Sequence, residues 1–78
     1  MWWFLKKITD NEQAIEYSYG CLSEKTSGIV RYDKVSEESS CVQLADGDTK
    51  KGVSVLLEHI WGIANRENAP SERKIAIG

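Results

Sequence analysis

A chain of 78 residues that is 41% hydrophobic suits one small domain, residues 1–78, and has too many apolar residues for a disordered chain. Its net charge of −2 lacks the basic excess that is typical of nucleic-acid-binding proteins. We expect no membrane partner, because no stretch approaches the ~20 apolar residues of a membrane span. We expect a cytoplasmic protein, because the N-terminal apolar run precedes its lysines, whereas a secretion signal has the reverse order.

The first part of the chain is predicted to form two strands. The aromatic-rich run at residues 2–8 favours a strand, and a polar break follows it. Thr9 and Glu12 have the spacing of a helix capping box, which would start a helix at Asp10. Apolar and polar residues then alternate with the period of a half-buried strand. We therefore predict a strand at residues 14–20, with a short helix within residues 10–18 as the alternative.

Two further strands are predicted before the helix, at residues 29–35 and 40–45. Short polar segments separate them from each other and from the preceding strand. Because short connections usually pair neighbouring strands, these three strands should form an antiparallel meander.

Residues 49–66 carry the clearest pattern of the chain, that of an amphipathic helix. At 100° per residue, seven apolar side chains fall on one arc of about 160°. Asp48 is predicted to be the N-cap, Pro70 lies beyond the end of the helix, and Val55 falls outside the arc and is expected to be exposed. The predicted apolar arc consists of Val53, Leu56, Leu57, Ile60, Trp61, Ile63 and Ala64.

A last strand at residues 74–77 completes an α+β fold: four strands, the helix, then one strand. We expect a single antiparallel or mixed sheet of four to five strands with the helix packed on one face. The pattern does not fix the strand order or the direction of the last strand.

Few residues have the chemistry for catalysis. Cys21 or Cys41 with His59 would make a cysteine-dependent enzyme, which is one alternative for function. The helical pattern places His59 on the polar side of the helix, which weakens that interpretation. We therefore predict free thiols, no catalytic residue and no cofactor. We also predict no metal site, since the chain has one histidine and its two cysteines are far apart.

The tyrosines suggest a second alternative. Tyr17, Tyr19 and Tyr32 could form a stacking platform for single-stranded nucleic acid on two paired strands. The helix needs a surface to pack on, however, and tyrosines beneath it would be inaccessible to a base. We therefore favour a protein partner over nucleic acid.

The N-terminal tryptophans point to protein binding. Trp2 and Trp3 face opposite sides of a strand, so one of them should be partly exposed, and exposed tryptophans are common anchors of interfaces. We predict a small interaction or regulatory module without catalytic activity, with a homodimer as one form. Its contact surface, on the outer sheet face or edge, would include Trp2 or Trp3, together with Arg31 and Val35.

Overall fold

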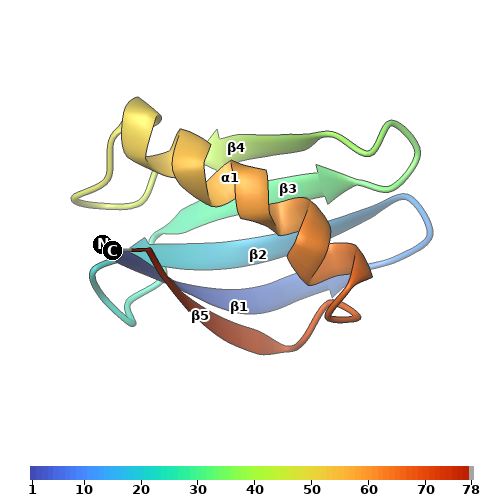
Figure 1. Cartoon of the computed structure of the whole chain (residues 1–78), viewed down its shortest axis with the longest axis horizontal. Helices are drawn as coiled ribbons and strands as arrows, with labels where there is room; N and C mark the ends of the chain where they lie inside the picture. The colour runs from blue at the N-terminus through green and yellow to red at the C-terminus, as the bar shows by residue number, and fades with distance from the viewer. Residues whose placement is uncertain (78) are drawn as a thin grey trace.

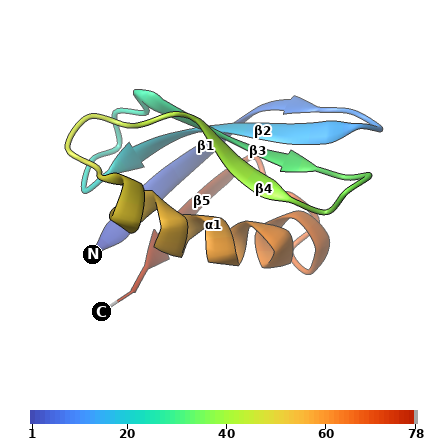
Figure 2. The same cartoon turned by 90° about the horizontal axis from the view of Figure 1, so that it is seen from above.

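Five antiparallel strands form one sheet in the computed structural model, which describes residues 1–77 (Figure 1). The strand order is β4-β3-β2-β1-β5, and the helix α1 lies across one face (Figure 2). The predicted α+β class and element order are confirmed, and the last strand runs antiparallel to the first. The elements are β1 (Trp2–Asp10), β2 (Ala14–Cys21), β3 (Gly28–Asp33), β4 (Ser39–Gln43), α1 (Lys50–Asn65) and β5 (Glu72–Ala76).

A side chain, not a helix, reverses the chain after β1. Asn11 Oδ1 accepts hydrogen bonds from the backbone N–H groups of Gln13, at 2.9 Å, and Ala14, at 3.0 Å. Such a contact stabilises a turn and competes with helix formation. The strand prediction for residues 14–20 is therefore confirmed, and the alternative of a short helix is wrong.

The helix begins with a different cap from the predicted one. Thr49 is the N-cap, and its hydroxyl accepts a hydrogen bond of 3.0 Å from Gly52 N. Asp48 is instead buried, where its carboxylate accepts hydrogen bonds from Trp3 Nε1 at 3.1 Å and Thr49 N at 2.7 Å. The prediction of Asp48 as the N-cap was wrong because the sheet supplies an indole donor that the local sequence does not show.

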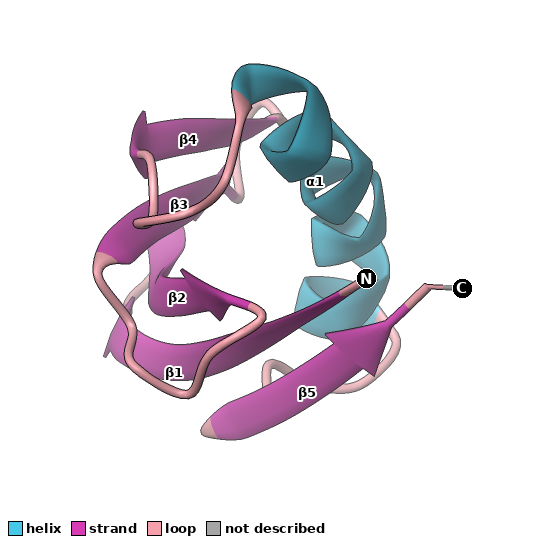
Figure 3. Cartoon of the chain, turned by 90° about the vertical axis from the view of Figure 1, so that its left-hand side faces the viewer, coloured by secondary structure: helices cyan, strands magenta, loops and turns pink. Residues whose placement is uncertain are grey.

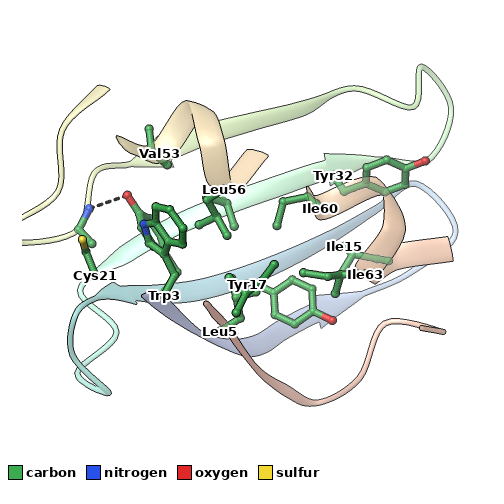
Figure 4. Packing of buried hydrophobic residues seen from close by; sticks show 14 of the residues in the cluster. Trp3, Leu5, Ile15, Tyr17, Cys21, Tyr32, Val53, Leu56, Ile60 and Ile63 are labelled. Carbon is green, nitrogen blue, oxygen red and sulfur yellow. Dashed lines mark hydrogen bonds between the residues drawn. The ribbon is translucent and has the colours of Figure 1, made fainter. Parts of the chain in front are cut away.

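The core lies between α1 and the inner face of the sheet (Figure 4). Two predictions for the helix differ from the structure. Val55 is partly buried and packs against the core, whereas Trp61 is 41% exposed. Trp61 lies at the edge of the predicted arc, and its Nε1 donates to Glu37 Oε1 at 3.1 Å in the turn between β3 and β4. Core residues from the sheet include Trp3, Leu5, Ile15, Tyr17, Tyr19 and Val30, and those from the helix are Val53, Leu56, Ile60 and Ile63.

The loop between β2 and β3 lies over the opposite, outer face of the sheet (Figure 3). A Cβ atom at Gly20 would collide with the carbonyl oxygens of Ser23 and Lys25, so the loop can approach the strand only at a glycine. Ser18 Oγ donates to Thr26 Oγ1 at 3.0 Å and holds the loop in place. Part of the outer face is therefore already covered by the chain itself.

The strand β3 ends two residues before its predicted end at residue 35. The carboxylate of Asp33 accepts hydrogen bonds from the backbone N–H groups of Val35, at 2.8 Å, and Ser36, at 3.0 Å, which turns the chain out of the sheet. Val35 therefore lies in the turn, where it is 82% exposed. Within residues 1–77, no helix has the length and apolar character needed to span a membrane.

Candidate interaction surface

The residues that could form a cysteine-dependent active site lie apart. Cys21 is buried, and burial raises the pKa of its thiol, with a further rise from the charge of Asp48. Cys41 is half-buried on β4, and both thiols are free. His59 is exposed and lines a groove of about 530 Å³ between α1 and β5, to which neither cysteine contributes. The structure therefore does not bring a thiol and the imidazole together.

The groove between α1 and β5 has charged walls, and part of this charge is already engaged by neighbouring side chains. Arg73 Nε donates to Glu67 Oε1 at 2.7 Å, and the Arg66 guanidinium lies 5.6 Å from the ring centroid of Trp61. In the part of the chain that the structure describes, no group of three or more His, Cys, Asp or Glu side chains could hold a metal ion. We assign no chemistry to this groove.

The three tyrosines are core residues. Tyr17, Tyr19 and Tyr32 are 1%, 0% and 3% exposed, so no base can stack on their rings in this structure. Their hydroxyl groups are also occupied: Tyr17 donates to Pro70 O at 2.7 Å, while Tyr19 accepts from Ala45 N at 3.0 Å. The hydroxyl of Tyr32 accepts from Asn65 Nδ2 at 3.0 Å.

The four predicted contact residues do not form one continuous surface. Trp3 is 1% exposed beneath the helix, so Trp2 is the tryptophan that reaches the outer face. Trp2 is half-buried, with the Lys74 ammonium group 4.2 Å from its ring centroid. Arg31 is also half-buried on the outer face and pairs with Glu16 at 3.5 Å. Of the four, only Val35 is exposed, and it lies in the turn before β4.

Exposed apolar side chains concentrate on the β4 side of the molecule. Of the seven large hydrophobic residues that are exposed within residues 1–77, four belong to β4, to the segments that flank it, or to the helix beside the β3–β4 turn. We call β4 together with these residues the β4 surface. The four residues are Val35 at 82%, Val42 at 57%, Leu44 at 41% and Trp61 at 41% exposed.

The backbone of β4 is open along one side, because β4 is the terminal strand of the sheet (Figure 2). Asp33 N donates to Glu38 O at 2.9 Å, which makes these two residues a hydrogen-bonded pair of the antiparallel ladder. Because such pairs alternate with non-bonded ones, Ser40 directs its N–H and C=O groups to β3. Ser39 and Cys41 therefore direct theirs to the free edge.

The opposite edge of the sheet, β5, is protected by charge. Glu72 and Lys74 have exposed side chains, and their backbone groups face the free edge, because Ser71 and Ile77 are bonded to β1. The guanidinium group of Arg73 donates to the carbonyl of Lys74 and so occupies one acceptor of this edge. By contrast, residues 39–45, which comprise β4 and the two residues after it, contain no charged side chain. Charged edges discourage the addition of a further strand, and β4 has no such protection along its length.

Comparison of the chain with protein-family models, curated proteins and solved structures finds no match. The β4 surface is therefore interpreted from its own geometry. Sequence patterns missed Val42 and Leu44 as surface residues, because the strand order that places β4 at an edge is a property of the assembled sheet.

Proposed function

We propose that this chain is a small cytoplasmic protein-interaction module, without catalytic activity, that accepts a strand of a partner protein along β4. The observation that carries the proposal is the uncharged free edge of β4, whose outward backbone groups belong to Ser39 and Cys41. Addition of an extended segment to a sheet edge is a common way to bind a protein partner.

The side chains around the edge support the same function. A partner strand would satisfy the open backbone groups of β4 and would cover neighbouring apolar side chains, chiefly Val42 and Leu44. Burial of apolar area contributes about 25 cal/mol for each Å² that is removed from water. Among the predicted contact residues, Val35 belongs to this surface, whereas Trp2 and Arg31 lie on the outer sheet face.

Proline substitutions can test the proposal without removing a hydrogen bond inside the sheet. Ser39→Pro removes an outward N–H group from β4, and the matched control Lys74→Pro removes an outward N–H group from β5. Each variant and the wild type would be immobilised as bait in an extract of the native host, after circular dichroism has shown that all three are folded. Bound proteins would be identified by mass spectrometry.

We expect a protein partner to be retained by the wild type and by Lys74→Pro, and to be lost from Ser39→Pro. Retention of the same partners by all three baits would show that the β4 edge is not the contact. Absence of any specific partner from every bait would contradict the binding of another protein along β4.

A further inference from the structure

We propose that the strand added to β4 is β4 of a second copy of this chain, related by a twofold axis through Ser40. This inference rests on the proposed function and names its partner. Antiparallel pairing of the two copies would join two five-stranded sheets into one continuous sheet. The axis would run perpendicular to the sheet, so that both helices lie on the same side.

The backbone pattern of β4 is self-complementary in this register. The axis at Ser40 places Ser39 of each copy opposite Cys41 of the other. Both residues direct their N–H and C=O groups to the free edge, as a hydrogen-bonded antiparallel pair requires. Ser40, which is bonded to β3, then faces Ser40 of the second copy in a non-bonded pair. If the pairing shifted by one residue, a residue whose backbone groups face the free edge would lie opposite a residue whose backbone groups face β3, and the two could not bond.

The ends of β4 are complementary in charge. The turn before the strand carries Lys34, Glu37 and Glu38, with a net charge of −1. The exposed charges that follow the strand are those of Asp46, Lys50 and Lys51, with a net charge of +1. Antiparallel pairing brings the turn of each copy to the segment after β4 of the other, so that segments of opposite net charge approach. A strand in the parallel direction would bring like ends together, which costs free energy.

The exposed apolar residues follow the same symmetry. Val35 lies in the turn at one end of β4, and Leu44 follows the strand at the other end. The twofold arrangement brings the Val35 end of each copy to the Leu44 end of the other, so that exposed apolar side chains lie at both ends of the interface. The remaining edge of each copy is β5, whose charges oppose further strand addition, and the assembly therefore closes at two copies.

Charge variants at Ser40 test the position of the axis. Ser40 is exposed, and in the proposed dimer its side chain lies directly opposite that of the second copy. We expect the wild type to show a concentration-dependent dimer in sedimentation equilibrium. Ser40→Lys and Ser40→Glu should each be monomeric, because two like charges would meet at the axis, and an equimolar mixture of the two should dimerise again. Ser71→Lys and Ser71→Glu, at an exposed serine beside β5, are the matched controls and should dimerise like the wild type.

A covalent trap gives a second measurement. Non-bonded antiparallel pairs have Cα atoms about 4.5 Å apart, which is within the range that a disulfide spans. Mild oxidation should therefore link Ser40→Cys into a dimer, whereas the wild type and Ser71→Cys should stay unlinked.

Three results would overturn the inference: a wild type that is monomeric at every attainable concentration, a dimer that is insensitive to the Ser40 substitutions, or a mixture of the Lys and Glu variants that stays monomeric. If the wild type is monomeric while Ser39→Pro abolishes capture of another protein, only the second copy as partner is refuted. The proposed function is refuted as well if both experiments fail.

Discussion

Two glycines of this fold should respond to the same substitution in opposite directions. A Cβ atom at Gly28 would lie 2.6 Å from Ala45 N and would collide with the ring of Tyr19. That ring cannot easily move, because Tyr19 is 0% exposed and its hydroxyl accepts a hydrogen bond from Ala45 N. Overpacking of this kind costs about 1–3 kcal/mol. At roughly 0.05–0.15 kcal/mol per residue, the whole chain has a stability of about 4–12 kcal/mol, so Gly28→Ala should remove a substantial part of it.

Gly62 is the matched position. A Cβ atom there would have no neighbour within 4 Å, and the residue lies inside α1. Gly62→Ala should therefore stabilise the protein by about 0.5–1 kcal/mol, because glycine is a poor helix former. Urea unfolding, followed by tryptophan fluorescence, would measure both variants against the wild type. Equal stability of Gly28→Ala and the wild type, or a loss of stability in Gly62→Ala, would refute the packing argument.

Two further predictions concern buried titratable groups. Burial, with smaller contributions from the charges of Asp10 and Glu67, raises the pKa of Tyr17 from 10.0 to about 12. Because the folded state favours the neutral phenol, this stabilisation is complete below pH 10 and is lost as the pH rises towards 12. The difference in tyrosinate absorbance between the wild type and Tyr17→Phe reports the ionisation of Tyr17. This difference should appear only near pH 12 or together with unfolding. Its appearance near pH 10 in folded protein would contradict the prediction. Cys21, followed in a Cys41→Ser variant, should react with iodoacetamide at neutral pH only after unfolding, since burial and Asp48 raise the pKa of its thiol. Reaction in the folded protein faster than that of free cysteine would restore the enzymatic interpretation.

Local periodicity was sufficient to predict most of the fold. The alternation around Tyr17 and the helical pattern around Ile60 each report which side chains share a face, and the structure buries both faces. On the helix, Trp61 and Val55 are the exceptions, since Trp61 is exposed and Val55 is partly buried. Side-chain hydrogen bonds that the periodicity does not show account for the errors. Trp3 withdraws Asp48 from the helix end, and Asp33 turns the chain before Val35 can join β3.

The candidate surface was less predictable than the fold. The exposure of a strand such as β4 depends on which strands become its neighbours, and this information is distributed over the whole chain. The sequence did predict that Trp2 and Trp3 face opposite sides, and the structure assigns Trp3 to the core. It could not show that the loop after β2 folds over part of the outer face, since that contact depends on the close approach of Ser23 and Lys25 to Gly20.

The pairing of β1 with β5 has a consequence for how the chain folds. The N–H and C=O groups of Met1 and Ile77 bond each other, so strands from the two ends of the sequence lie side by side. Closing a loop between such distant segments costs conformational entropy, and contacts of this kind form slowly. The strand β1 leaves the ribosome before β5, so the edge of β1 that β5 covers can be paired only after β5 has been synthesised. Until then this edge exposes unpaired backbone groups, and unpaired strand edges favour aggregation.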